Sequence, residues 1–313
     1  MSELHTVFGA SGALGSAVVH HLQAEGLPTR AIARNAERAA DMLPDGIEIV
    51  ECDATDQVAV IEAIKGAGVV YNCTYVGDQM QAVAENMMIG ARNAGATLVN
   101  PSNALVYGPL KQMPATENHP QQPTARRGQV RKQLEEMLMG AYERGDVRVV
   151  IPRLPTFYGA HVTGTFMAGI FESANANRKA LWLGSLDASH DIIYLPDAAA
   201  ACVLLATNQE AYGQVWHTPG AGPLTAREFI IRVYKAFGLE PKMGTRSRTF
   251  FQLAGVVAPR VAEMVEVMYQ FEQPFTLDGS KFAHAFPNFE YTPHGLGIAD
   301  TVEWYRAALA KPA

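Results

Sequence analysis

The chain has 313 residues, 48% of them hydrophobic, and a formal net charge of −6. A chain of this length buries about three quarters of the surface that it exposes when unfolded, so its core needs no disulfide or metal to stabilise it. The negative charge offers no electrostatic attraction to nucleic acid or to an anionic membrane, and we expect neither as a partner.

Cysteine usage and apolar runs indicate a protein of the cytosol. The three cysteines, Cys52, Cys73 and Cys202, are widely spaced and lie mostly within apolar runs, which argues against a disulfide framework or a zinc site. Apolar stretches such as residues 198–206 are far shorter than the roughly 20 residues of a membrane helix. The first residues do not resemble a leader, so we expect a cytoplasmic protein that acts on a small molecule.

Short β-like runs alternate with longer stretches of helical period through the first half of the chain. Leu14, Val18 and Leu22 recur on one helical face, and Gly26 follows them as a C-terminal cap. A similar apolar stripe predicts a helix over residues 129–143. Alternation of this kind is typical of a parallel sheet with helices on both faces. The predicted strands are Thr6–Phe8, Arg30–Ala33, Glu48–Glu51, Val69–Cys73, Thr97–Asn100 and Arg148–Ile151.

We therefore predict an α/β protein built on a Rossmann fold, that is, a doubly wound parallel sheet with helices on both faces. This domain takes residues 1–152 and is completed by about residues 190–218. Beyond residue 152 Pro, Gly and aromatic residues become frequent, as in segments that surround a cleft. Residues 153–189 and 219–313 are expected to form a smaller C-terminal substrate-binding lobe.

A glycine-rich turn lies between the first strand and the first helix, where Gly9, Gly12 and Gly15 alternate with small residues. One glycine permits a tight turn, the next lets the backbone approach phosphate oxygens, and the third lets helix and strand pack closely. The free N–H groups and the positive end of the helix then favour an anion. The turn predicts a binding site for a dinucleotide pyrophosphate.

The end of the second strand distinguishes NAD from NADP. An acidic residue there would bind the ribose 2′-hydroxyl of NAD, but this strand ends in Ala33 and Arg34. A guanidinium instead suits a 2′-phosphate, and Arg38 follows one turn later. We expect NADP(H), with NAD(H) as the weaker alternative.

The chain resembles the extended short-chain dehydrogenases and reductases, also described as the NAD-dependent epimerase/dehydratase family. Matching segments are Gly9–Gly15, Cys52–Asp56, Val69–Tyr75, Asn100–Gly108, Pro152–Gly159, His190–Asp197, Asp278–Phe282 and Trp304–Arg306. The turn, the strand end and the resemblance together nominate as cofactor-binding residues Gly9, Ser11, Gly12, Ala13, Leu14, Gly15, Arg34, Arg38, Asp53, Ala54, Thr74, Lys132, Leu154 and Pro155.

The resemblance weakens at the catalytic positions. Asn103 takes the place of the family's active serine or threonine, with Ser102 one residue earlier. Lys132 stands where the lysine of the family's Tyr-x-x-x-Lys pair would lie, but Gly128 replaces the tyrosine. The resemblance therefore implies an atypical member that lacks the family's proton donor.

Other groups must then stabilise the oxyanion that hydride transfer produces. Our candidates for catalytic residues are Lys132, Asn103, Tyr75 and Tyr158. Each has a structural alternative: Lys132 as a ribose ligand, Asn103 as a turn-former, and the tyrosines as walls. His161 and His190 titrate near neutrality in model peptides, but no motif places either at the chemistry. No ligand spacing supports a metal.

Substrate identity depends on the smaller lobe. The runs Phe250–Leu253 and Met264–Tyr269 are apolar and suit a small, mostly apolar carbonyl or conjugated compound, although core packing also explains them. Arg246 and Arg248 leave a sugar diphosphate open. Three hypotheses follow: an NADP(H)-dependent oxidoreductase, a nucleotide-sugar epimerase or dehydratase, and a non-catalytic NADP(H) sensor. The resemblance also implies a homodimer that pairs through the helix at 129–143.

Overall fold

The computed structural model describes residues 3–246, 248–249, 251 and 264–310. The chain divides into two compact units, each with an apolar core cluster of its own. Unit 1 comprises Met1–Asn103, Val130–Leu154 and Leu195–Trp216. Unit 2 comprises Ala104–Gln129, Pro155–Tyr194 and His217–Ala313.

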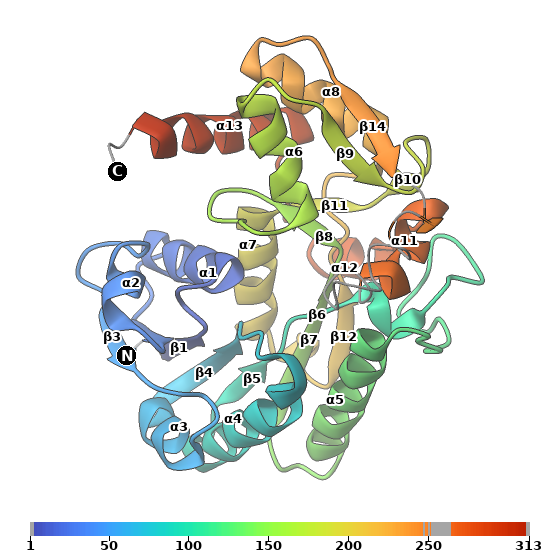
Figure 1. Ribbon diagram of the computed structural model, residues 1–313. Helices are drawn as coiled ribbons and strands as arrows, with labels where there is room; N and C mark the ends of the chain where they lie inside the picture. Colours follow the sequence, from blue (N-terminus) through green and yellow to red (C-terminus); the bar gives the residue numbers. More distant parts are fainter. Residues whose placement is uncertain (1–2, 247, 250, 252–263, 311–313) are drawn as a thin grey trace. The chain divides into compact units, whose positions relative to one another are not determined.

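Unit 1 is built on one sheet (Figure 1). In spatial order its strands are β12 (Gln214–His217), β7 (Arg148–Leu154), β5 (Thr97–Val99), β4 (Ala67–Asn72), β1 (Leu4–Phe8), β2 (Thr29–Ala33) and β3 (Glu48–Glu51), and β6 (Ser102–Asn103) pairs with β7. The pairings from β3 to β7 are parallel, with Phe8 opposite both Ile32 and Asn72. Their carboxyl ends therefore share one edge, which is where the glycine-rich turn begins.

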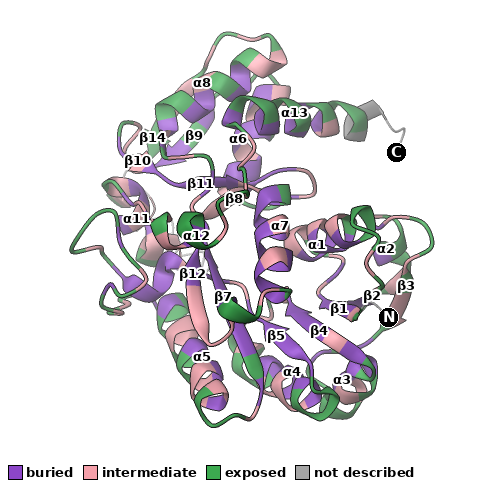
Figure 2. Ribbon diagram, turned by 180° about the vertical axis from the view of Figure 1, so that it is seen from behind, coloured by how far each residue is buried: buried purple, intermediate pink, exposed green. Residues whose placement is uncertain are grey.

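Helices cover both faces of this sheet, as the strand and helix pattern predicts. Helix α1 packs against α7, and α3 packs against α4. A single apolar cluster joins the sheet to α3, α4 and α5. The central strands are buried on both faces (Figure 2), which is why they read as continuous apolar runs. The helical elements of unit 1 are α1 (Ala13–Ala24), α2 (Ala36–Ala40), α3 (Gln57–Ile64), η1 (Gly77–Gln79), α4 (Met80–Ala94), α5 (Arg126–Glu143), α7 (Leu195–Ala206) and η3 (Gln209–Ala211). The start of α5, residues 126–129, belongs to unit 2.

Helix α1 shows how local sequence produces this architecture. Val18, Val19 and Leu22 are fully buried, and side chains of this kind contribute about 1.5–3 kcal/mol each when buried. Gly26 has a φ of 67° and donates its N–H to the carbonyl of Gln23. Only glycine adopts that conformation freely, so the helix ends there, as predicted.

Unit 2 combines short strand pairs with helices. Strands β8 and β11 pair in parallel, as do β9 and β14, whereas β10 and β13 are antiparallel. Among the residues that the structure describes, the named elements of unit 2 are η2 (Ala104–Tyr107), β8 (Thr156–Tyr158), α6 (Phe166–Asn175), β9 (Ala180–Leu183), β10 (Ser189–His190), β11 (Ile192–Tyr194), β13 (Leu224–Thr225), α8 (Ala226–Phe237), β14 (Met243–Arg246), α11 (Tyr269–Glu272), α12 (Ser280–Ala285) and α13 (His294–Ala310).

Residues 104–129 group with unit 2, although the boundaries drawn from the sequence leave them in the first domain. The reason is apolar packing. Leu105, Val106 and Tyr107 form one cluster with Phe275 and Leu277. Contacts this distant in sequence give no local pattern from which the grouping can be recognised.

Candidate functional site

The glycine-rich turn needs glycine at its two ends for reasons of packing. Gly9 has a φ of 75°, and a Cβ there would lie 2.6 Å from the carbonyl oxygen of Cys73. A Cβ on Gly15 would lie 2.2 Å from the carbonyl oxygen of Gly9. Backbone atoms cannot move aside at such distances, so the turn closes only when both side chains are absent.

The start of α1 has backbone donors that no side chain caps. Its N-cap residue is Gly12, which is exposed, has an extended backbone and provides no side-chain cap. The N–H of Gly12 itself donates to the carbonyl of Gly9 at 2.9 Å. The amides of Ala13, Leu14 and Gly15 in the first turn have no intrahelical acceptor, and no acidic side chain lies there. This is the local geometry that receives a phosphate group.

Two arginines follow β2 at the same edge of the sheet. Arg34 and Arg38 are both exposed, and neither takes part in an ion pair among the residues that the structure describes. Asn35 caps α2 by accepting the Arg38 N–H at 2.7 Å. The cap fixes the backbone between the two arginines and leaves their guanidinium groups in solvent.

The acidic segment after β3 forms a rigid turn. The Asp53 carboxylate accepts hydrogen bonds from the N–H and the hydroxyl of Thr55, at 2.9 and 2.8 Å. These bonds, aided by the charge of Arg34, lower the pKa of Asp53. Asn86 on α4 donates to the carbonyls of Ala54 and Thr55. Sequence reasoning missed Asn86, because a buried asparagine within an apolar helix carries no motif.

A pair of asparagines joins the ends of β4 and β5. Asn72 donates to Asn100 at 2.8 Å, and both are buried. The side-chain oxygen of Asn72, Oδ1, in turn accepts a hydrogen bond from the Thr74 hydroxyl at 2.7 Å. Thr74 is therefore held in place, while Tyr75 is 59% exposed.

Asn103 and Lys132 both belong to unit 1, on β6 and α5. Asn103 pairs with Leu154 across the β6–β7 ladder, so the structure brings a predicted catalytic residue beside a predicted cofactor residue. The Lys132 ammonium lies 3.7 Å from Glu136 and is 35% exposed. Pro155 is half-buried and is the single residue between β7 and β8.

A buried ion pair involves the sequence neighbours of Asn103 and Leu154, and no sequence motif indicated it. Glu135 accepts a 2.5 Å hydrogen bond from the Ser102 hydroxyl and two 3.2 Å hydrogen bonds from the Arg153 Nε. A further close contact joins Arg153 Nη2 to Glu135 Oε2. Arg153 is fully buried and Glu135 is 3% exposed. The sequence shows only an acidic pair on a helix, which is typical of a solvated face.

Position 128 has no room for a side chain. A Cβ on Gly128 would lie 2.4 Å from the carbonyl oxygen of Leu105 and 2.7 Å from Pro123. The 3-10 helix η2 thus packs against the backbone of α5 at this point. The local packing therefore requires glycine at this position, and a tyrosine would not fit.

Tyr158 lies in the core of unit 2. It is 1% exposed, and its ring packs against Phe171 and Phe229. Its hydroxyl donates to the carbonyl of His294 at 3.5 Å. These contacts favour a structural role for Tyr158.

Both histidines named in the sequence analysis, His161 and His190, belong to unit 2. Burial lowers the pKa of His190 to about 4, so this histidine does not titrate near neutrality. His161 has a φ of 61°, and its ring lies against Trp304.

The run Met264–Tyr269, nominated for substrate binding, packs mainly into the core. Met268 and Tyr269 are buried, and Val267 packs on the cluster of Leu105 and Phe275. In the other run Phe250, Gln252 and Leu253 lie outside the described residues. Arg248 pairs with Glu272 at 2.9 Å.

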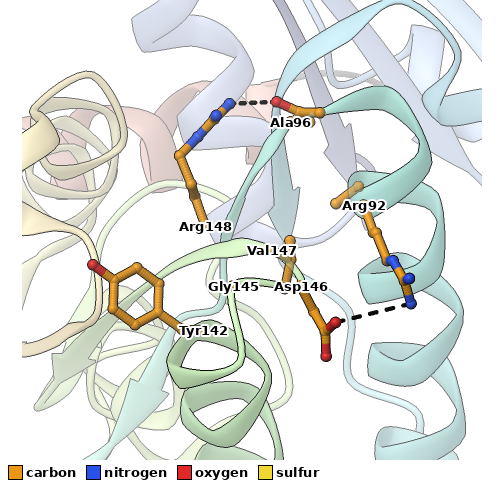
Figure 3. A pocket seen from close by; sticks show the side chains of 9 residues that line it. Arg92, Ala96, Tyr142, Gly145, Asp146, Val147 and Arg148 are labelled. Carbon is orange, nitrogen blue, oxygen red and sulfur yellow. Dashed lines mark hydrogen bonds and ion pairs between the residues drawn. The ribbon is translucent and has the colours of Figure 1, made fainter.

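A pocket of about 270 Å³ lies at the opposite edge of the sheet, at the amino ends of β5 and β7 (Figure 3). Arg92 points toward Asp146 across it, with a closest N–O separation of 4.0 Å. Arg148 is already bound to the Thr97 hydroxyl at 3.0 Å. Parallel strands place this pocket far from the glycine-rich turn, so it is no part of that site.

Within the described ranges no helix is long and apolar enough to cross a membrane. The same residues contain no group of three or more His, Cys, Asp or Glu side chains arranged to hold a metal ion.

Residues 5–216 match the model of the NAD dependent epimerase/dehydratase family. The chain belongs to this family. The assignment covers both the glycine-rich turn and the segment with Gly128, and it confirms the resemblance read from the sequence.

A reductase is among the proteins that the chain resembles in sequence. The chain is 26% identical to a 2′-dehydrokanamycin reductase of Streptomyces kanamyceticus over 245 residues, which is 74% of this chain and 66% of that protein. It therefore spans just under two thirds of the length of this relative.

Solved structures share the fold. The Bordetella bronchiseptica enzyme WbmH, in complex with NAD+, superposes with a TM-score of 0.76 at 20% identity, covering 98% of this chain and 99% of WbmH. The dTDP-glucose 4,6-dehydratase of Bacillus anthracis, in complex with NAD, gives 0.81 at 15% identity, covering 98% and 97%. These likenesses confirm the predicted fold class, while the homodimer and the cytoplasmic location stay predictions.

Proposed function

We propose that this protein binds a nicotinamide dinucleotide, NADP(H) in preference to NAD(H), and reduces a carbonyl or conjugated group of a small molecule. The observation that carries the proposal is the start of α1, where Gly12 provides no side-chain cap for the backbone amides of the first turn. A side chain on Gly9 would overlap the backbone of Cys73, and one on Gly15 would overlap the backbone of Gly9, so the residues present fit a pyrophosphate.

The nicotinamide dinucleotide would lie along the carboxyl edge of the sheet. Arg34 and Arg38 suit a 2′-phosphate because both guanidinium groups are exposed beside the end of β2. The rigid turn at Asp53 and Ala54 suits the adenine end. The full set that we propose to hold the dinucleotide is Gly9, Ser11, Gly12, Ala13, Leu14, Gly15, Arg34, Arg38, Asp53, Ala54, Thr74, Lys132, Leu154 and Pro155.

When bound, the dinucleotide supplies a hydride, and the protein must then stabilise negative charge on the substrate oxygen. Ser102 donates its only hydroxyl proton to Glu135, so it is not the donor. Asn103 and Lys132 are the donors that we propose, with the exposed Tyr75 as a third. The contacts of Tyr158 place it in the core of unit 2, which argues against a role for its hydroxyl.

The printed function of the relative from Streptomyces kanamyceticus, a reductase, supports reduction over epimerisation. The pairing of Arg248 with Glu272 also weighs against a sugar diphosphate, since this guanidinium is already neutralised. Epimerases and dehydratases among the solved structures favour the alternative reaction. A nicotinamide dinucleotide sensor without turnover is the third possibility, because Gly128 excludes a phenol.

One experiment separates these possibilities. Oxidation of NADPH is followed spectrophotometrically over a panel of aldehydes, ketones and enones, with matched sugar nucleotides in a second panel. Turnover of a carbonyl compound supports the reductase. Tightly retained NAD with turnover of a sugar nucleotide would establish the epimerase or dehydratase instead. Measurable NADPH affinity with no turnover in either panel would leave the sensor.

A further inference from the structure

One buried carboxylate on α5 contacts two strands of unit 1. Glu135 belongs to α5, its partner Ser102 to β6, and its partner Arg153 to β7. Ser102 is 5% exposed, and the two charged residues are more deeply buried. Ser102 lies 33 residues before Glu135 in the sequence, and Arg153 lies 18 residues after it.

Each partner is the sequence neighbour of a residue in the proposed site. Asn103 follows Ser102, Leu154 follows Arg153, and these two neighbours pair across the ladder. Lys132 precedes Glu135 by three residues, which is about one helical turn. A shift of the Glu135 carboxylate would therefore move β6, β7 and the helix segment with Lys132 together.

The chemistry of the pair fixes the direction of its hydrogen bonds. Arg153 remains protonated, and its two Nε contacts and close Nη2 contact hold Glu135 as an acceptor. Ser102 can then only donate to it. Replacing a buried ion pair with apolar residues is often neutral for stability, whereas such pairs in some proteins fix one arrangement among alternatives.

We propose that Glu135 is a positioning residue, which through Ser102 and Arg153 sets the separation of Asn103, Leu154 and Lys132. This inference rests on the proposed function, because those three residues are among the ones that we propose to stabilise the substrate oxygen or to hold the dinucleotide. Glu135 touches neither reacting group. Its effect is on geometry, where a displacement of about 1 Å costs on the order of 100-fold in rate.

Ser102→Ala is the first test, because it removes one hydrogen bond and leaves the ion pair intact. We expect kcat to fall about 10- to 100-fold, while the dissociation constant for NADPH changes less than about twofold, since the glycine-rich turn is untouched. Ser102→Thr retains the hydroxyl and is expected to recover most of the lost kcat.

Thr97→Val is the matched control. Thr97 is also buried, lies on the same sheet and accepts one hydrogen bond, from Arg148 at 3.0 Å. It lies at the amino end of β5, however, away from the proposed site. We expect a similar loss of thermal stability with kcat unchanged. Equal losses of kcat in Ser102→Ala and Thr97→Val would overturn the positioning role.

A measurement on the ligand-free protein keeps this test apart from the proposed function. Hydrogen exchange of peptides spanning residues 100–106 and 130–137 is expected to accelerate in Ser102→Ala and in Glu135→Gln, but not in Thr97→Val. Unchanged exchange in those peptides would overturn the inference even if the protein is a reductase. Accelerated exchange in a protein without any turnover would uphold the link between these elements and reject the reductase.

Discussion

Gly128 has no space for a side chain. An added Cβ would lie 2.4 Å from the carbonyl oxygen of Leu105. The family's tyrosine therefore cannot be restored by a single substitution. Gly128→Tyr, which looks from the sequence like a way to recover carbonyl reduction, is expected to disturb the contact between α5 and η2 instead.

Gly128→Ala tests that packing directly. We expect the free energy of unfolding to fall by about 1–3 kcal/mol, because backbone must move to accept the methyl group. Gly140→Ala in the same helix is the control, since its nearest neighbour is the flexible end of Arg144 at 3.3 Å. That control is expected to gain about 0.5–1 kcal/mol. Denaturant titration measures both, and an equal response of the two variants would contradict the packing argument.

Arg34→Ala tests the cofactor preference. Loss of a charge-assisted hydrogen bond costs about 1.5–3 kcal/mol, so NADPH should bind about 10- to 100-fold more weakly, while NADH should change less than about threefold. Calorimetric titration with each dinucleotide measures the difference. Arg92→Ala, at the opposite edge of the sheet, should leave both affinities unchanged. Equal losses for NADPH and NADH in Arg34→Ala would remove the case for a 2′-phosphate.

At the scale of elements, the glycines at the junction of β1 and α1 serve both dinucleotide binding and the stability of the fold, and single mutations can separate the two. A methyl group on Gly12 meets only the Gly9 carbonyl, at 3.2 Å, whereas on Gly15 it would overlap that carbonyl at 2.2 Å. We expect dinucleotide affinity to fall at least about tenfold in Gly12→Ala, with little loss of stability. The added methyl group would hinder the approach of the phosphate to the backbone amides at the start of α1. Gly15→Ala should lose both, and equal melting temperatures for the two variants would contradict this division.

The β10–β11 segment of unit 2 gives the fold a pH dependence. Burial raises the pKa of Asp191 to about 7, against about 3.9 in an unfolded chain. Its carboxylate accepts the N–H of Leu277 at 2.5 Å. Between these pH values the native state holds a proton that the unfolded state lacks, so the contribution of Asp191 to stability is complete below about pH 4 and is lost as the pH rises through 7.

Asp191→Asn is expected to remove this dependence. At pH 8 the variant should be more stable than the wild type, by up to about 4 kcal/mol, and the gain should vanish toward pH 4. Burial lowers the pKa of the neighbouring His190 to about 4, which has the opposite slope. The difference between variant and wild type is therefore the quantity to measure, because His190 contributes to both. A difference that does not vary with pH would show that Asp191 is ionised throughout.

At the scale of the whole molecule, ligand binding should be visible as stability. A dinucleotide at about 100 times its dissociation constant adds about 2.7 kcal/mol, which corresponds to a rise of roughly 5–10 °C in the melting temperature of a protein this large. NADPH should raise the melting temperature more than NADH at equal concentration. Equal or absent shifts from both would leave the proposed cofactor preference without support.

The sequence by itself determined strands β1–β5 and β7 of the unit 1 sheet and the place of the glycine-rich turn, whereas β6 and β12 were not predicted. The predicted strands and the turn follow from neighbouring residues: apolar runs of strand length, a helical stripe capped at Gly26, and glycines at the junction of the first strand and helix. Local steric and hydrophobic preferences dominate there, so the pattern alone is enough to place the turn at the carboxyl edge of the sheet.

Only the tertiary structure decided the rest of the site. The Ser102–Glu135–Arg153 network, the Asn72–Asn100 pair and the closed space at Gly128 each join segments distant along the chain. Tyr158, a candidate proton donor by sequence, lies in a core. Such outcomes depend on which backbone atoms and side chains become neighbours after folding, and no periodicity or spacing within a segment records that.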